Sequence, residues 1–123
     1  MQSALVRERG LSKLYVSVER TCGISSFRIV LKDSYGTLVE ERRETFEKYG
    51  GDASEYSAVV RALEMSARYC REKVYVFTSN RRILNHLNRG RTIKNKKISR
   101  LVVEIRFLQG FFKCVRFFQV PRN

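Results

Sequence analysis

Apolar and polar residues alternate in the first part of the chain, at the spacing of half-buried strands. Residues 14–20 place apolar side chains at every second position, and residues 27–31 form a second short strand-like segment. Turn-forming residues occupy positions 33–36, after which residues 37–46 return as a third strand. This pattern predicts an antiparallel meander of three strands.

A helical pattern follows the glycine pair at 50–51, and Asp52 is placed to cap that helix at its amino end. Apolar residues at three- and four-residue spacing predict an amphipathic helix of about five turns. These residues are Tyr56, Val59, Val60, Leu63, Ala67 and Cys70.

The rest of the sequence predicts four more elements. Residues 73–77 are almost continuously apolar, as in a strand buried on both faces. A short helix over 81–88, an amphipathic helix over 98–108 that Gly110 ends, and an aromatic-rich strand over 112–120 follow. The order β-β-β-α-β-α-α-β predicts an α/β architecture, a five-stranded mixed sheet with helices on its faces.

The chain length bounds the domain organisation. At 123 residues the chain is long enough for one core and too short for two. We therefore expect a short leader over residues 1–12 and one domain over residues 13–123.

Positive charge is concentrated in the second part of the chain. Residues 1–72 carry 12 basic and 11 acidic side chains, whereas residues 73–123 carry 13 basic side chains and the single acid Glu104. Because like charges repel, a one-sign cluster indicates a polyanionic partner, and we expect nucleic acid in preference to an anionic membrane. The residues that we expect to bind it are Arg81, Arg82, Arg89, Arg91, Lys94, Lys96, Lys97 and Arg100.

Other features of the composition narrow the class of protein. Cys22, Cys70 and Cys114 are widely spaced and the chain has one His, so we expect reduced, wholly or partly buried thiols and no zinc site. No stretch approaches the ~18 apolar residues of a membrane span, and the amino end has no signal-peptide run. We therefore expect a cytoplasmic or nuclear protein that is not secreted. Most aromatic residues fall at core-facing positions, which indicates no base-stacking surface.

Several short strings, in their order and spacing, resemble the type 1 ribonuclease H family over residues 13–123. The string SEY at 54–56 resembles the family's A-E-Y at the start of its first long helix, and ILNHLN at 83–88 resembles V-V-N-Q-L-N. The pair KN at 94–95 falls where many members have V-K-N, and the terminal QVPRN resembles H-V-P-R-x-x-N. The resemblance implies a ribonuclease H-like fold.

The resemblance also implies where the catalytic carboxylates of the family, which hold two divalent metal ions, would stand. Ser17 occupies the place of the Asp in T-D-G, and Ser79 occupies the place of the Asp in S-D-S. Glu55 matches the helix Glu, and the chain ends before the fourth carboxylate and the last helix. Because a hydroxyl is a poor ligand for Mg²⁺, we predict that the chain is not an enzyme and holds no metal or cofactor. Glu55 would then be kept as a capping-box residue.

Three functions follow from these expectations. The leading one is a catalytically inactive ribonuclease H-like module, within a larger complex, that binds duplex or structured RNA or DNA. The second is a weak Mg²⁺-dependent nuclease in which Glu19, on the same strand face as Ser17, joins Glu55. The third is a homodimer or protein-binding domain that uses the sheet face left open by the missing last helix. We expect apolar surface on that open face, with Phe112, Phe117 or Phe118 as the candidates for exposure.

The nature of the nucleic acid stays open at this point. Family enzymes carry a long Gly-rich loop between their first two strands, and its backbone lies against the substrate. The corresponding loop over residues 20–26 is shorter here and contains only Gly23. Recognition of the 2′-hydroxyls in an RNA/DNA hybrid is therefore not implied.

Overall fold

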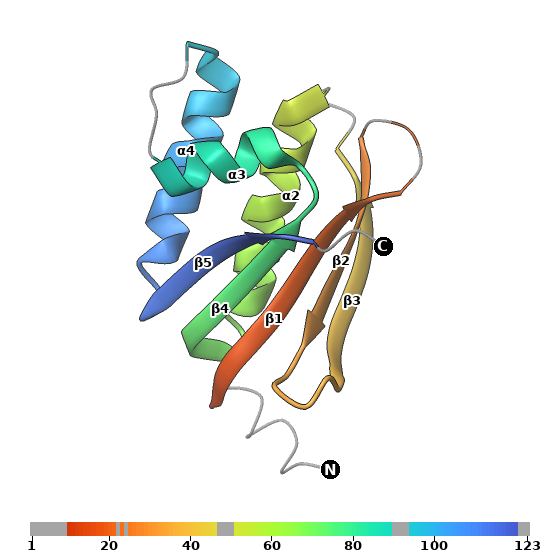
Figure 1. Cartoon of the computed structure of the whole chain (residues 1–123), viewed down its shortest axis with the longest axis vertical. Coiled ribbons are helices and arrows are strands. Elements are labelled where there is room, and N and C mark those ends of the chain that lie inside the picture. Colours follow the sequence, from red (N-terminus) through yellow and green to blue (C-terminus); the bar gives the residue numbers. More distant parts are fainter. Residues whose placement is uncertain (1–9, 22, 24, 47–50, 90–93, 121–123) are drawn as a thin grey trace.

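The computed structural model describes residues 10–21, 23, 25–46, 51–89 and 94–120. In this part of the chain the elements follow the predicted order (Figure 1). They are β1 (Leu11–Arg20), β2 (Ser26–Lys32), β3 (Leu38–Thr45), α2 (Gly51–Ser66), β4 (Cys70–Thr78), α3 (Arg81–Arg89), α4 (Lys96–Gln109) and β5 (Cys114–Gln119).

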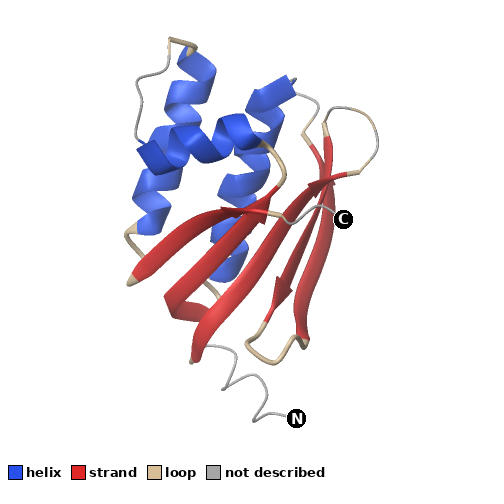
Figure 2. Cartoon of the chain, in the orientation of Figure 1, coloured by secondary structure: helices blue, strands red, loops and turns tan. Residues whose placement is uncertain are grey.

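The strands form one mixed sheet in the order β3-β2-β1-β4-β5. β1 and β2 are antiparallel, as are β2 and β3, whereas β4 runs parallel to both β1 and β5. A parallel β4–β5 pair needs a crossover connection, and α3 and α4 supply it. Figure 2 shows the helices gathered on one side of the sheet. The predicted five-stranded mixed sheet is confirmed.

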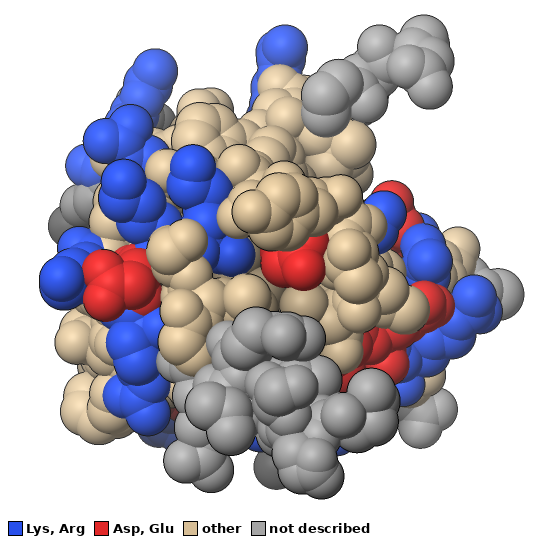
Figure 3. Space-filling view, turned by 90° about the horizontal axis from the view of Figure 1, so that it is seen from below, with Lys and Arg blue, Asp and Glu red and all other residues tan. Residues whose placement is uncertain are grey.

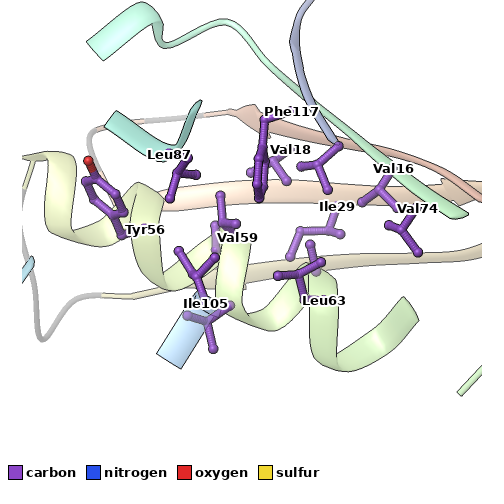
Figure 4. Close-up of a cluster of buried hydrophobic side chains, with 14 of the residues drawn as sticks. Val16, Val18, Ile29, Tyr56, Val59, Leu63, Val74, Leu87, Ile105 and Phe117 are labelled. Atoms are coloured by element: carbon purple, nitrogen blue, oxygen red, sulfur yellow. The ribbon is translucent and has the colours of Figure 1, made fainter. Parts of the chain in front are cut away.

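Helix α2 is the centre of the hydrophobic core. Its Val59 and Leu63 side chains are fully buried among residues of the sheet and of the other helices, including Val16, Val18 and Ile105 (Figure 4). A helix that is buried almost all round, as this one is, needs small residues where neighbours approach closely. In α2 the small residues at these contacts are buried serines and alanines: Ala53, Ser54, Ser57, Ala58, Ala62 and Ser66.

The carboxyl end of α2 differs from the prediction. The helix ends at Ser66, and Cys70 is the first residue of β4 instead of the last residue of the helix. The chain turns between them because the amides of Arg68 and Tyr69 bond to carbonyls three residues back, which tightens the last turn. Cys70 is fully buried, so its apolar character suits either element.

The start of the last strand also differs. Residues 110–113 form a turn, and β5 begins at Cys114, two residues after the predicted start. The Phe112 side chain is buried from that turn. In the part of the chain that the structure describes, no helix has the length and apolar character needed to cross a membrane.

Candidate functional site

The carboxyl ends of β1 and β4 meet the amino ends of α2 and α3 around one buried carboxylate. Glu55 lies in the second turn of α2 and is only 3% exposed. Its Oε1 accepts hydrogen bonds from Arg20 Nη2 at 2.8 Å and from Asn80 Nδ2 at 3.1 Å, and its Oε2 accepts one from the Thr78 hydroxyl at 2.7 Å. A buried charge requires this degree of pairing and hydrogen bonding.

Asn80 connects this carboxylate to the start of α3. Its side-chain oxygen accepts hydrogen bonds from the backbone amides of Arg82 and Ile83, at 3.0 and 3.2 Å, and so caps the helix. Its amide nitrogen donates to Glu55 and, at 3.3 Å, to Asp52 Oδ1. Asp52 Oδ2 in turn accepts a 2.8 Å bond from Arg82 Nη1. The beginnings of two helices are therefore joined by one polar network.

This network replaces the capping roles predicted for Asp52 and Glu55. The helix already includes Gly51, so Asp52 lies inside its first turn, and the Asp52 carboxylate bonds to Asn80 and Arg82. The carboxylate of Glu55 is bound by the ends of β1 and β4 and by Asn80, which precedes α3. Capping is a local interaction, whereas the Glu55 partners are 23 to 35 residues away in sequence. The predicted capping roles are not the ones these carboxylates have in the structure.

Glu19 does not share a site with Glu55. Val16 and Val18 of β1 point into the core beneath α2, so the alternation of the strand places Ser17 and Glu19 on the other face. Glu19 Oε1 lies 3.3 Å from Arg28 Nη1 on that face. Glu19 therefore lies on the outward face of β1 with Arg28 as its partner, whereas Glu55 of α2 is buried with other partners.

The arrangement around Glu55 does not fit the two-metal site of ribonucleases H. Both of its oxygens accept hydrogen bonds, and the Arg20 guanidinium places a positive charge beside Oε1. Ser79, at the other carboxylate position, is exposed. Among the described residues no three His, Cys, Asp or Glu side chains come together in a way that would hold a metal ion. We therefore derive no metal-dependent step.

A second polar pair lies next to this network. The hydroxyl of Tyr56 hydrogen-bonds to Nδ1 of His86, which joins α2 to α3. Burial, followed by the negative charge of Asp52, raises the pKa of Tyr56 to about 12. The tyrosine therefore stays protonated through the physiological range and can act as a hydrogen-bond donor to His86.

The predicted nucleic-acid-binding residues lie on the surface of α3 and at the amino end of α4. We call this set, without Arg91, the α3–α4 cationic surface. Its members are Arg81, Arg82, Arg89, Lys94, Lys96, Lys97 and Arg100, and all are exposed. Arg91 lies outside the described residues. Figure 3 shows the opposite, lower end of the molecule, where Lys and Arg predominate on the left of the view and both signs are interspersed on the right.

One feature of the α3–α4 cationic surface favours anions beyond its charge. Helix α4 begins there, and Asn95 caps it by accepting hydrogen bonds from the Lys97 and Ile98 amides at 2.9 and 3.1 Å. The positive end of a helix dipole adds to the attraction for phosphate. Arg82 differs from its neighbours because its guanidinium is paired with Asp52.

The partners of Glu55 were not predicted from the sequence. Arg20 is the last residue of β1, Thr78 and Asn80 flank Ser79, and only the parallel pairing of β1 with β4 brings them to the same edge. One signal was available in the string TSN, because a strand end followed by a helix start is a common place for a capping Asn.

The prediction of exposed aromatic residues was partly wrong. Phe112 and Phe117 are 8% and 6% exposed and belong to the core, whereas Phe118 is 39% exposed. Phe117 pairs with Val76 on the face that the helices cover, and strand alternation turns Phe118 to the opposite face. The apolar side chains with the highest exposed fractions in the carboxyl-terminal part are instead Val103 and Phe107 of α4, at 66% and 69%.

The chain is similar in structure to ribonucleases H of known structure. Ribonuclease H1 of the archaeon Halobacterium salinarum superposes with a TM-score of 0.79 at 20% identity, over 89% of this chain and 86% of that one. The N-terminal ribonuclease H domain of a Mycobacterium tuberculosis protein gives 0.79 at 15% identity, over 89% and 88%. LC11-RNase H1, a compost metagenome protein solved with an RNA/DNA hybrid, gives 0.77 at 17%, over 89% and 86%. These similarities show the fold.

These findings also correct the prediction that the chain is not an enzyme. That prediction rested on Ser17, Ser79 and the position of the chain end. It is opposed by the similarity to ribonuclease H enzymes and by the family match, so the prediction is wrong. The serines are facts of the sequence, but they do not by themselves establish a loss of activity.

Family membership rests on the sequence model that covers most of the chain. A search of curated protein sequences found no match. The model described as reverse transcriptase-like matches residues 14–123, from β1 to the end of the chain. This chain therefore belongs to the reverse transcriptase-like family and has a ribonuclease H-like fold.

Proposed function

We propose that this domain binds duplex nucleic acid, RNA/DNA hybrids included, through the α3–α4 cationic surface. The observation that carries the proposal is the exposure of all seven cations of that surface, in a part of the sequence without a carboxylate between Glu72 and Glu104. Clustered exposed cations displace the counterions condensed on a duplex, which supplies sequence-independent affinity. Most such contacts go to phosphate, so we expect little sequence preference.

The similar structures support the hybrid as one of the substrates. LC11-RNase H1 has been solved in complex with an RNA/DNA hybrid, and its chain matches 89% of this one. The loop between β1 and β2, where Thr21 N bonds to Ser26 O at 2.9 Å, is short. Contacts to the hybrid would therefore come mainly from the helical side, and discrimination between hybrid and duplex RNA would be small.

A binding titration tests this proposal. Fluorescence anisotropy with labelled hybrid, duplex RNA and duplex DNA is measured at ~50 mM and at ~200 mM salt, between which phosphate-driven binding weakens strongly. We expect Lys97→Gln/Arg100→Gln to weaken binding of all three duplexes. The matched control is Arg42→Gln/Arg68→Gln, which makes the same change in net charge away from the surface. Equal losses in both double variants, or no binding at the lower salt, would contradict the proposal.

A second candidate function is hydrolysis of the bound strand, which the similarity to ribonucleases H supports. The described residues around Glu55 do not fit a two-metal site, so Mg²⁺ and Mn²⁺ are each tested and not assigned, and Glu55 is tested as the described carboxylate at the helix position of the family. The same substrates are incubated with each ion, and product formation is followed on denaturing gels. Cleavage by the parent chain that disappears in a folded Glu55→Gln variant would assign the activity to this site. Cleavage that persists in that variant would exclude Glu55.

A further inference from the structure

The sheet has a second face that none of the described helices covers. On β1 and β4, Val16, Val18, Val74 and Val76 point into the core, and the residues between them point the other way. The pairing registers align these outward positions across the sheet. Tyr15 lies beside Tyr75, and Ser17 lies beside Phe77, which in turn lies beside Phe118. We call this surface the open sheet face.

Four aromatic rings form a continuous cluster on the open sheet face. The Phe77 and Phe118 rings are stacked, with centroids 5.3 Å apart and planes at 27°. Tyr75 makes edge contacts with Phe118 at 5.6 Å and with Tyr15 at 5.5 Å, and Tyr15 lies 6.3 Å from Phe77. All four are partly or largely exposed. Contacts of this kind belong in a core or an interface, so a cluster facing solvent indicates a binding surface.

Cations surround the aromatic cluster. The outward positions of the strands also carry Lys13, Lys32, Lys73 and Arg116, and the Lys13 ammonium lies 5.8 Å from the centre of the Tyr75 ring. The carboxylates on this face, Glu19 and Glu41, are both bound by Arg28, at 3.3 and 2.7 Å. The face therefore has a net positive charge, because its cations outnumber these two carboxylates.

A hollow of about 240 Å³ opens beside the rings. Tyr15 and Phe77 form its apolar wall, and Ser17, Arg28 and Lys32 add a hydroxyl and two cations to its lining. Glu19, the partner of Arg28, also lines it. A planar aromatic group placed there would contact ring surfaces and hydrogen-bonding groups together. Ser17 thus faces this hollow and not the Glu55 network.

We propose that the open sheet face binds single-stranded nucleic acid. Its bases stack on the Tyr15, Tyr75, Phe77 and Phe118 cluster, and its phosphates contact the surrounding lysines and Arg116. Rings interleaved with cations on a flat sheet are the combination that single strands require, because every base offers a stacking face and every nucleotide a negative charge. This site goes beyond the proposed duplex binding, and it lies on the other side of the sheet from the α3–α4 cationic surface.

The surrounding charge favours nucleic acid over a protein partner. Protein interfaces deplete lysine from their centre, whereas Lys13 and Lys32 stand directly beside the rings in the register of β1 and β2. A second copy of this chain would bring the same positive charge to the contact and be repelled. A single-stranded polyanion has the complementary charge.

Anisotropy with a fluorescein-labelled single strand of about 12 nucleotides, unable to self-pair, tests the site. We expect Phe118→Ala to weaken single-strand binding about 5- to 100-fold, as the loss of one stacked base does. Its binding to a duplex should stay within about twofold. The matched control is Phe107→Ala, which removes an exposed ring from α4 and should leave both affinities unchanged.

A second measurement keeps the test independent of altered folding. Ultraviolet crosslinking of a 4-thiouridine-containing single strand to the parent chain should attach it to peptides that contain residues 75–77 or 118. Crosslinks confined to α3 and α4 would overturn the proposal, as would equal losses in Phe118→Ala and Phe107→Ala. A concentration-dependent rise in mass on light scattering that Phe118→Ala abolishes would make the face an interface between copies instead.

Failure of this site can be distinguished from failure of duplex binding. Lys97→Gln/Arg100→Gln should weaken duplex binding and spare the single strand, with Phe118→Ala showing the reverse. Simultaneous binding of a labelled single strand and an unlabelled duplex should be observed, and strict competition between them would argue for one shared site.

Discussion

The Arg20 guanidinium lies 2.8 Å from the Glu55 carboxylate and joins the end of β1 to the second turn of α2. The Glu55 side chain is 4% exposed and that of Arg20 is 32% exposed, so the pair forms at the border of the core. Arg20 also covers the Phe27 ring at 4.9 Å. The arginine thereby contributes packing as well as charge to the junction of the sheet and the central helix.

Loss of Arg20 should destabilise the fold through the carboxylate that remains. Arg20→Met keeps much of the apolar contact but leaves a buried charge without its cation, and we expect the free energy of unfolding to fall by about 1–3 kcal/mol. The lower half of that range is favoured because the arginine is partly exposed to solvent. Urea denaturation, monitored by circular dichroism, measures this change in the free energy of unfolding.

Two comparisons control this prediction. Arg28→Met breaks solvent-exposed pairs with Glu19 and Glu41 and should lower the free energy of unfolding less than Arg20→Met does, because water screens those pairs. The double variant Arg20→Met/Glu55→Gln should recover part of the loss, because the uncompensated charge is gone. A double variant whose loss equals the sum of the single losses would show that the two side chains are not coupled.

The capping residues of α3 and α4 give a second prediction. Asn80, which caps α3, is hydrogen-bonded to Glu55, whereas Asn95, which caps α4, is not part of that network. Asn80 and Asn95 each accept two backbone hydrogen bonds at a helix start. Asn80 also donates to Glu55 and Asp52, whereas Asn95 is exposed. Asn95→Ala should cost about 1 kcal/mol, and Asn80→Ala should cost at least about 1 kcal/mol more. Equal losses in urea denaturation would mean that the network adds no stability.

The sequence predicted the elements of the fold well, because their signals are local. Residues 14–20 alternate and Tyr56, Val59 and Leu63 recur at helical spacing, and each pattern predicts its own element. The errors in the prediction lie at the ends of the helices and strands. Cys70 extends the helical pattern in sequence, but the chain turns after Ser66 because the last carbonyls accept bonds from three residues on.

The site was harder to predict, because its contacts join distant segments. Family resemblance pointed to Glu55, but no local pattern relates it to Arg20, 35 residues away. The open sheet face was missed for a similar reason. Tyr15, Tyr75 and Phe118 each fall on strands where an aromatic suits a core, and only the parallel registers of β1, β4 and β5 show that they share the uncovered face.

Tyr56 should make the stability of the protein fall at high pH. Its pKa is about 12 in the folded chain because of burial, against an ordinary value of 10.0. The unfolded chain therefore loses this proton first, and the contribution of Tyr56 is intact below pH 10 and is lost as the pH rises toward 12. Thermal melts of the parent chain and of Tyr56→Phe between these pH values measure the effect.

The same pKa shift has a spectroscopic signature. The chain has six tyrosines, and the tyrosinate absorbance near 295 nm should include a late step near pH 12 that belongs to Tyr56. Tyr56→Phe should remove that late step. A late step that persists in this variant would assign the shift to another tyrosine.

The described thiols should react at different rates. Cys70 is fully buried at the start of β4, and burial raises the pKa of its thiol, so little thiolate is present near neutral pH. Cys114 is only partly buried. Iodoacetamide labelling of the native chain, followed by peptide mass spectrometry, should modify Cys114 before Cys70, and both should react equally in urea. Faster labelling of Cys70 under native conditions would contradict the packing of β4 against β1.

The salt dependence of duplex binding should report how many cations contact phosphate. Seven exposed cations form the α3–α4 cationic surface, and Arg82 is already paired with Asp52. If the other six each displace a counterion, the slope of log K against log salt is about −5. Lys97→Gln/Arg100→Gln should bring it to about −4, since two contacts are removed. Asp52→Asn frees Arg82 and should make the slope steeper by about 1. A parental slope shallower than about −2, or one that neither variant alters, would show that this surface does not hold the duplex.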